Sequence, residues 1–126
     1  MSQREDSGFK SFSAGEAIPL YSRVKLHTDG TVLMAGLAEK SIGTLQTDAG
    51  VSGQPVSVKL RSAAGTHKVR VKEAVAIAAN LYSEAAGEVQ DTAETTAFLE
   101  MTALEAATAE DDVVEALYHN ATGAAA

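Results

Sequence analysis

The chain has 126 residues, no cysteine and no tryptophan, and a formal net charge of -7 at pH 7. This length is enough for one modest hydrophobic core, and the lack of cysteine excludes disulfides, thiolate metal sites and cysteine nucleophiles. No apolar run approaches the roughly 20 residues of a membrane helix, and residues 1–8 lack the apolar segment of a secretory signal. We therefore expect an intracellular protein that has no membrane partner.

The charges are divided unequally along the chain. Residues 1–72 contain all ten Lys and Arg residues and six Asp and Glu residues, whereas residues 73–126 contain eleven Asp and Glu residues. Opposite charge in the two halves favours attraction within one chain or between neighbouring copies, although acids also keep a surface soluble. The acidic second half argues against a nucleic-acid partner, because phosphate contacts need a dominant basic surface.

Residues 1–15 are polar and interrupted by glycine, and their only aromatic side chains are Phe9 and Phe12. A frayed terminus is one interpretation of this composition. The other is an extended N-terminal arm that lays Phe9, Lys10 and Phe12 on a partner, since two of the three phenylalanines of the chain lie here.

The next segment predicts a β-hairpin. Val24 and Leu26 alternate with polar residues, and the pair Asp29-Gly30 before a second apolar run suits a type I′ turn. A short strand over residues 42–45 then leads into a glycine-containing loop.

Residues 55–73 predict a second hairpin, because valine and leucine alternate with polar residues on both sides of a break that contains Gly65. Like charges that face each other on paired strands repel, so an acidic group should lie nearby. The polar face of this hairpin would carry five cations, Lys59, Arg61, Lys68, Arg70 and Lys72.

These five cations allow three interpretations. In the first interpretation, they protect exposed strand edges from unwanted pairing, as lysine often does. In the second, they form an intersubunit or partner contact with acids such as Glu110, Asp111 and Asp112 of a neighbour. In the third, they bind a polyanion or carbohydrate, which would make the chain a β-barrel binding module built on residues 59–72.

Residues 93–118 are ambiguous between helix and strand. Their propensities and the spacing of Phe98, Met101 and Leu104 indicate a helix. As strands, alternate residues including Met101 would line one face, and a loop over residues 108–112 would lead to a second strand.

A weak internal repeat favours the strands. Residues 41–45, a polar loop and residues 56–60 parallel residues 100–104, a polar loop and residues 113–117. Each unit would then be strand, loop, strand.

Many short strands with regular turns predict an all-β fold, either a small antiparallel β-barrel or a β-sandwich. We expect residues 1–15 to be the N-terminal arm, residues 16–119 a single β domain, and residues 120–126 a disordered tail.

No motif indicates catalysis or cofactor binding. His27, His67 and His119 lack the spacing of a metal site, and we expect them to be exposed on strands or near a terminus. The sequence contains no Gly-x-Gly-x-x-Gly fingerprint, Walker-type loop or Gly-x-Ser-x-Gly elbow. We expect no catalytic, cofactor-binding or metal site, and therefore no enzyme.

Several short motifs occur in a recognisable order: Gly-Glu-Ala-Ile at residues 15–18, the Asp-Gly hairpin at 29–30, Ser-Ile-Gly-Thr-Leu at 41–45, Val-Ser-Val at 56–58, Ala-Asn-Leu-Tyr at 79–82, Ala-Ala-Gly-Glu-Val at 85–89, Leu-Glu-Ala-Ala at 104–107 and Val-Val-Glu at 113–115. From Ala14 to His119 this order resembles the small tailed-phage head decoration, or cement, proteins. The chain departs from them at Asp111-Asp112, which stand at a turn where such proteins often have glycine.

The resemblance implies a compact, non-enzymatic β fold that binds the outer surface of an assembled phage head in many copies and stabilises it. Its partners would be the major capsid protein and further copies of itself, as trimers in preference to dimers. It would be made in the cytoplasm of the bacterial host and end on the virion, with Phe9, Lys10 and Phe12 laid on the shell.

Overall fold

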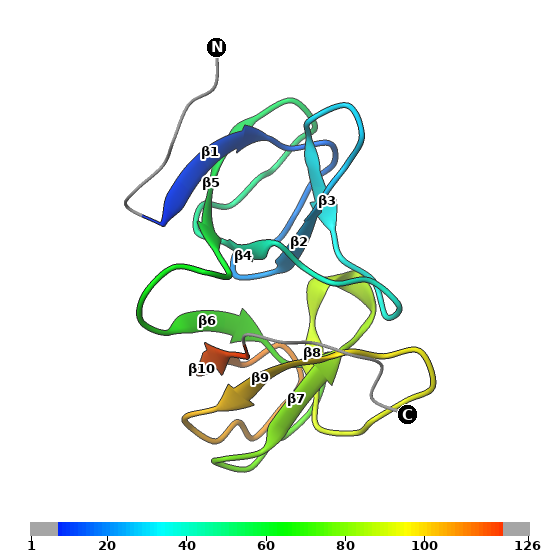
Figure 1. Ribbon diagram of the computed structural model, residues 1–126, viewed down its shortest axis with the longest axis vertical. Coiled ribbons are helices and arrows are strands. Elements are labelled where there is room, and N and C mark those ends of the chain that lie inside the picture. The colour runs from blue at the N-terminus through cyan, green and yellow to red at the C-terminus, as the bar shows by residue number, and fades with distance from the viewer. Residues whose placement is uncertain (1–7, 120–126) are drawn as a thin grey trace.

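The structure, a computed structural model, describes residues 8–119, which form short strands and a single 3-10 turn (Figure 1). The strands build two five-stranded sheets in which all neighbouring strands are antiparallel, so the expected all-β class is confirmed. The first sheet contains β1 (Phe9–Ser13), β2 (Arg23–Leu26), β3 (Val32–Met34), β4 (Gly43–Leu45) and β5 (Pro55–Leu60). The second contains β6 (His67–Arg70), β7 (Asn80–Ser83), β8 (Val89–Gln90), β9 (Leu99–Ala103) and β10 (Val113–Tyr118), with the turn η1 (Ala85–Gly87) before β8.

The two sheets have the same strand order. It is β1-β5-β4-β2-β3 in the first and β6-β10-β9-β7-β8 in the second, so every strand of one sheet has an equivalent in the other. Parallel bridges at equivalent places, Ala14 to Val32 and Val71 to Val89, bring the two ends of each sheet together. Each sheet therefore curls toward a small barrel. We call residues 8–60 the first repeat and residues 67–119 the second repeat.

The internal repeat predicted from the sequence is confirmed and extends over both sheets. The two units that it paired are β4 with β5 and β9 with β10, and these strands are equivalent by sheet order. In Figure 1 the first repeat lies above the second along the long axis.

Each repeat packs its own core inside its curled sheet. With few aromatic residues in the chain, the cores consist mostly of Val, Ala, Leu and Ile, whose burial drives folding. The first core contains Ala14, Ile18, Val24, Val32, Leu45, Ala49, Val56 and Val58. The second contains Val69, Val71, Val75, Leu81, Val89, Met101, Ala103, Ala107, Val114, Ala116 and Tyr118.

Residues 93–118 form strands within a longer loop structure, so the strand interpretation of this region is confirmed. Met101 and Ala103 of β9 are fully buried between β7 and β10. β10 alternates exposed and buried residues along its whole length, which is the period of a strand with one wet face. Burial in the second core thus overrides the helical propensity of the segment.

The predicted hairpin at Asp29-Gly30 is present, but its turn type differs. β2 and β3 pair antiparallel, with Leu26 opposite Val32. Gly30 has a φ of +89°, whereas Asp29 keeps a negative φ, which excludes the predicted type I′ turn because that turn needs positive φ at both central residues. The Asp29 side chain instead accepts hydrogen bonds from the N–H and hydroxyl of Thr31.

The predicted hairpin over residues 55–73 is wrong. Its two halves are β5 and β6, which belong to different sheets. β5 is paired on both edges, with β1 and with β4, so no edge remains for β6, which pairs with β10. Residues 61–66 form the link between the repeats, and the five cations therefore do not share a two-stranded ladder.

The described part of the predicted N-terminal arm is integrated into the first sheet. β1 pairs with β5 along its entire length, from Phe9 opposite Lys59 to Ser13 opposite Pro55. Residues 1–7 of the expected arm and the expected tail at 120–126 lie outside the described residues.

Candidate functional site

The aromatic side chains of β1 have different surroundings. Phe9 is 41% exposed, whereas Phe12 is partly buried and packs against the first core. The Lys59 ammonium lies 5.8 Å from the ring centre of Phe9, and that of Lys10 lies 5.9 Å from the ring centre of Phe12. Phe9 is therefore the more exposed aromatic residue of this strand.

Three of the five predicted contact cations are paired with acids of the same chain. Arg61 binds Glu100 at 3.3 Å. Lys72 binds Glu84 at 3.3 Å, and this contact raises the pKa of Lys72. Arg70 binds two carboxylates, described below. The predicted neutralisation of the cations by acids therefore occurs inside the chain for these residues.

The predicted acids of the second half lie in the turn before β10. Asp111 pairs with Arg70 at 3.2 Å. Asp112 closes the turn by accepting the N–H groups of Thr108 and Ala109, both at 3.1 Å, and Glu110 is exposed.

Asp111 has a φ of +67° at the place equivalent to Gly53, whose φ is +89°. The main-chain bonds are equivalent too, since Gly53 N–H donates to Ala14 O and Asp111 N–H donates to Val71 O. The second repeat thus forms with an aspartate the turn that Gly53 forms in the first, and aspartate tolerates this conformation better than most residues.

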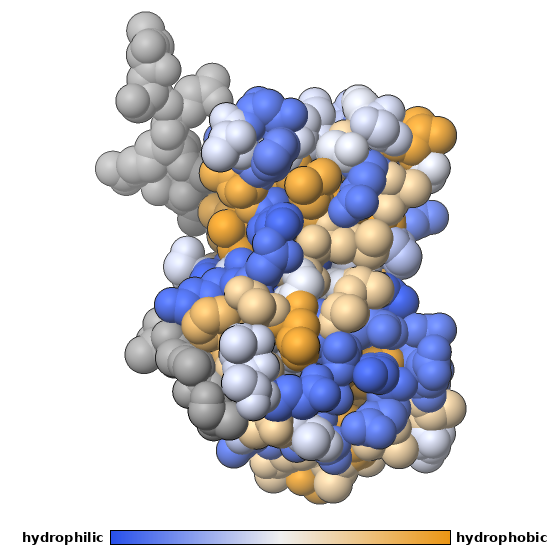
Figure 2. Space-filling model, turned by 90° about the vertical axis from the view of Figure 1, so that its right-hand side faces the viewer, coloured by the Kyte–Doolittle hydropathy of each residue, from blue (hydrophilic) through white to orange (hydrophobic). Residues whose placement is uncertain are grey.

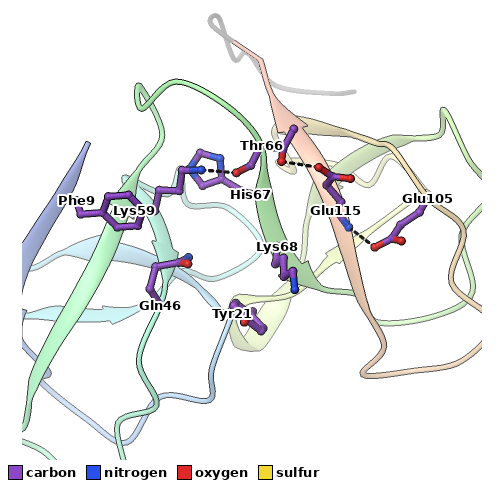
Figure 3. A pocket seen from close by; sticks show the side chains of 9 residues that line it. All are labelled: Phe9, Tyr21, Gln46, Lys59, Thr66, His67, Lys68, Glu105 and Glu115. Atoms are coloured by element: carbon purple, nitrogen blue, oxygen red, sulfur yellow. Dashed lines mark hydrogen bonds between the residues drawn. The ribbon is translucent and has the colours of Figure 1, made fainter. Parts of the chain in front are cut away.

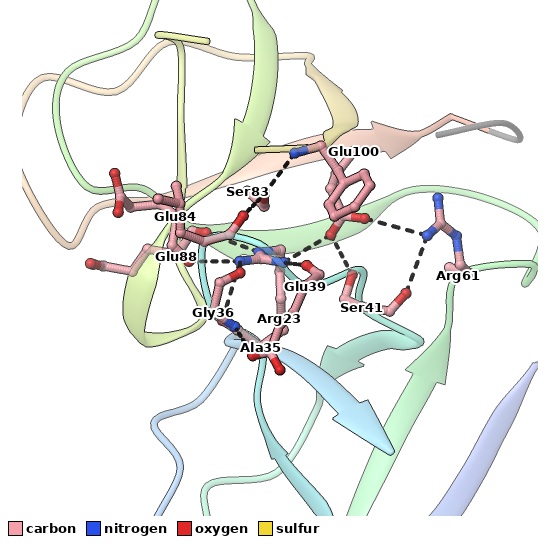
Figure 4. Close-up of polar contacts among 12 residues, drawn as sticks. Arg23, Ala35, Gly36, Glu39, Ser41, Arg61, Ser83, Glu84, Glu88 and Glu100 are labelled. Carbon is pink, nitrogen blue, oxygen red and sulfur yellow. Dashed lines mark hydrogen bonds and ion pairs between the residues drawn. The ribbon is translucent and has the colours of Figure 1, made fainter. Parts of the chain in front are cut away.

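A buried ion pair joins the two repeats (Figure 4). Arg23 of β2 and Glu100 of β9 are fully buried, and their charged groups lie 3.0 Å apart. Glu100 also accepts the hydroxyl of Ser41 at 2.6 Å, and that hydroxyl lies 2.6 Å from the Tyr118 hydroxyl. Burial and the Glu100 charge raise the pKa of Tyr118, so the phenol remains protonated.

The Arg23 guanidinium is saturated with acceptors from both repeats. Such saturation is what allows a charge to be buried without a large penalty. Besides Glu100, it donates to the main-chain carbonyls of Ala35, Gly36, Glu39, Glu84 and Glu88. Sequence reasoning missed this pair, since an arginine in an alternating strand is usually placed on the wet face.

A second cluster lies at the same junction. Arg70 approaches Glu88 at 3.4 Å and Asp111 at 3.2 Å, and its N–H donates to Tyr21 O at 3.2 Å. Burial, together with hydrogen bonding to Asp111, raises the pKa of Glu88 to about 7, and the Arg70 charge opposes this shift. Glu88 therefore changes charge near neutral pH.

His67 is buried, so the expectation that it is exposed is wrong. It is 2% exposed and meets Tyr118 edge to face, with ring centres 4.6 Å apart. Burial lowers its pKa, and its Nε2 lies 3.1 Å from Leu60 O. His67 therefore packs against Tyr118 in the interior, next to the junction of the two repeats.

A polar groove of about 520 Å³ opens on the surface where the repeats meet (Figure 3). The first repeat contributes Phe9, Gln46 and Lys59, and Tyr21 lies between them and β6. The wall from the link and second repeat consists of Thr66, His67, Lys68, Glu105 and Glu115. Two lysines and two glutamates make the lining close to neutral.

Figure 2 shows hydrophilic side chains gathered over the lower part of the face drawn, where the second repeat lies. This agrees with the excess of acids in residues 73–126. Within residues 8–119, no group of three or more His, Cys, Asp or Glu side chains could hold a metal ion. The part of the chain that the structure describes also has no helix of the length and apolar character needed to span a bilayer.

The fold therefore consists of two curled five-stranded antiparallel sheets with the same strand order, and a buried ion pair joins one sheet to the other. No family model matches the sequence, and no curated protein matches it. Among solved structures, the chain is similar to the crystal structure of the head fiber gp8.5 N base in bacteriophage phi29. The TM-score is 0.70 at 14% identity, over 88% of this chain and 92% of that chain. At this identity the similarity is one of fold.

Proposed function

We propose that the chain is a non-enzymatic decoration protein of a phage head, which binds the outer surface of the assembled shell in many copies and stabilises it. The observation that carries the proposal is the fold shared with a phage head fiber base over 88% of the chain. The motif order from Ala14 to His119 supports the same role.

The contact with the major capsid protein is proposed to involve β1. This strand lies at one end of the sheet order, with β5 on one side only. Its main chain can accept a further strand, and Phe9 offers an exposed ring beside it. Phe12 supports the contact indirectly, because it fixes β1 to the first core.

Many copies would each contribute a small contact, and oligomers would gain avidity by bridging capsid subunits. We propose a homo-oligomer, a trimer in preference to a dimer, with the virion surface as its location after synthesis in the bacterial host. We propose that such contacts also use Lys10, Lys59, Lys68, Lys72 and Glu110, whose side chains are exposed or partly exposed.

The alternative, a polyanion-binding module built on residues 59–72, has less support. Arg61, Arg70 and Lys72 are paired with carboxylates of the same chain. Phosphate or sulfate groups would have to compete with these carboxylates.

The proposal is tested by adding purified chain to phage heads that lack it. We expect saturable binding at a fixed number of copies per head and a higher temperature of head disruption. Binding that never saturates, or heads no more stable at full occupancy, would reject the stabilising role. A matched binding assay on heparin and neutral polysaccharide tests the alternative.

A further inference from the structure

A gap in main-chain hydrogen bonding lies along β6, the strand that borders the groove. In an antiparallel pair, successive residues direct their N–H and C=O alternately toward and away from the partner strand. Val71 N–H donates to Asp112 O on the β10 side at 3.0 Å, whereas Arg70 N–H donates to Tyr21 O on the opposite side. By the same alternation, the N–H and C=O of Lys68 point away from β10.

The hydrogen bonds of the opposite residue in β10 also indicate that the N–H and C=O of Lys68 point away from β10. Glu115 stands directly opposite Lys68. Its N–H donates to Glu105 Oε1 at 2.7 Å and its C=O accepts from Leu104 N–H at 2.8 Å, so both groups face β9. The alternation thus leaves Lys68 without a ladder bond to β10, and among the described residues no hydrogen bond outside the strand ladders reaches its main chain.

The neighbours of Lys68 on this edge are occupied. On one side the Lys59 ammonium donates to Thr66 O, and on the other Tyr21 O accepts from Arg70 N–H. The open donor and acceptor of Lys68 therefore form a single two-bond opening beside the groove that Lys68 lines. This opening has the size of one residue of an added strand.

We propose that the groove binds an extended peptide segment of a partner protein, which adds to β6 through the open main-chain groups of Lys68 and places an acidic side chain beside the Lys68 ammonium. In strand addition, main-chain bonds supply affinity and alternate side chains supply specificity. The residue that exchanges both bonds with Lys68 lies directly across from it, with its side chain on the same face.

Among the charged groups of the groove, the Lys68 ammonium favours an acidic side chain of the peptide. The carboxylates are engaged within the protein, since Glu115 accepts the Thr66 hydroxyl at 2.6 Å and Glu105 accepts Glu115 N–H. The Lys68 ammonium lies 5.8 Å from the ring centre of Tyr21, and no described carboxylate forms an ion pair with it. A carboxylate of the peptide would therefore find an unpaired cation.

The volume agrees with a short segment. At about 520 Å³ the groove is in the range that holds small ligands. This binding is a property of the isolated protein and does not require the proposed capsid role, because heads can be bound through β1 while the groove is empty.

The first test is hydrogen exchange of the full chain without any peptide. We expect the Lys68 amide to exchange at least about a hundredfold faster than that of Val69, which is bonded to β10. Equal protection of the two amides would mean that the edge is closed and would overturn the proposal.

The second test titrates the full chain with the peptide acetyl-Thr-Val-Glu-Val-Thr-amide, followed by amide NMR shifts. We expect saturable shifts at Lys68, Tyr21 and Gln46, slower exchange of the Lys68 amide, and about tenfold weaker binding of the same peptide with Gln in place of Glu. Lys68→Gln should abolish the preference for Glu, while Lys40→Gln, outside the groove, should retain it. Equal binding of both peptides to the natural chain, or no shifts up to millimolar peptide, would overturn the proposal whatever happens on heads.

Discussion

Arg23 is the residue on which the junction between the repeats depends. Its guanidinium is fully buried, 3.0 Å from Glu100, and donates to carbonyls of both repeats. Removing one partner of such a pair leaves the other charge buried without compensation, which costs far more than the net contribution of the pair.

We therefore expect Arg23→Met to lower the free energy of unfolding by about 3 to 5 kcal/mol, measured by urea denaturation. Lys25→Met is the matched control, because Lys25 pairs with Glu39 near the surface, and its loss should cost about 1 kcal/mol or less. Equal losses for the two variants would show that the buried pair has no special role.

Glu88 gives the junction a dependence on pH. Its pKa is raised from the usual 4.5 to about 7 in the fold, so the folded state holds more protons than the unfolded state between these values. The free energy of unfolding contributed by this group therefore falls as pH rises from 4.5 to 7. Arg70, Asp111 and Glu110 are the charges that influence it.

Glu88→Gln should remove this dependence. The stability of the variant relative to the natural chain should rise with pH across the window from 4.5 to 7, as measured by urea denaturation at several pH values. A constant difference across the window would show that Glu88 does not titrate there.

Among the elements, β1 is part of the first sheet, so its role in attachment to heads cannot be tested by deleting the N-terminal residues. Deleting residues 1–15 would remove a strand paired along its whole length with β5, and with it part of the first core. Point variants separate attachment from folding, because Phe9 is 41% exposed and Phe12 packs inward.

Phe12→Ala should destabilise the fold by about 3 kcal/mol. Phe9→Ser should change stability by less than about 1 kcal/mol and should weaken attachment to heads severalfold. Thermal unfolding and occupancy on heads measure the two effects. Unchanged occupancy of Phe9→Ser would remove the exposed ring of β1 from the proposed contact.

Elements were more predictable from the sequence than their pairing. Alternation located β2, β5 and β6, because a strand with one buried face reveals itself through its period of two. The internal repeat, and not alternation, indicated β10. Pairing depends on which edges are free, and nothing in residues 55–73 shows that both edges of β5 are taken by β1 and β4. For that reason the sequence pattern indicated a hairpin where the chain passes between repeats.

In the whole molecule, the opposite charges seen in the sequence pair within the chain. Of the six ion pairs among the described residues, two cross the junction and four lie inside one repeat. Cations from the first repeat and the link meet acids of the second, as in the pairs Arg23 to Glu100 and Arg61 to Glu100. The candidate site was predictable only in part, since Phe9, Lys59 and Lys68 were named from the sequence. Tyr21, Gln46 and Glu105 were not, because only the packing of the repeats brings them to the groove.

The junction also predicts how the molecule unfolds. Because Arg23 and Glu100 come from different repeats, neither repeat can open without exposing a buried charge of the other. We expect one cooperative transition for the natural chain, with equal calorimetric and van't Hoff enthalpies. Two separate transitions would contradict this coupling.

Density-gradient sedimentation of an infected lysate that contains the chain tests whether it decorates a phage head. We expect the chain to travel with intact heads in a fixed ratio to the major capsid protein. Recovery of the chain only as a small species at the top of the gradient, with none on the heads, would contradict it.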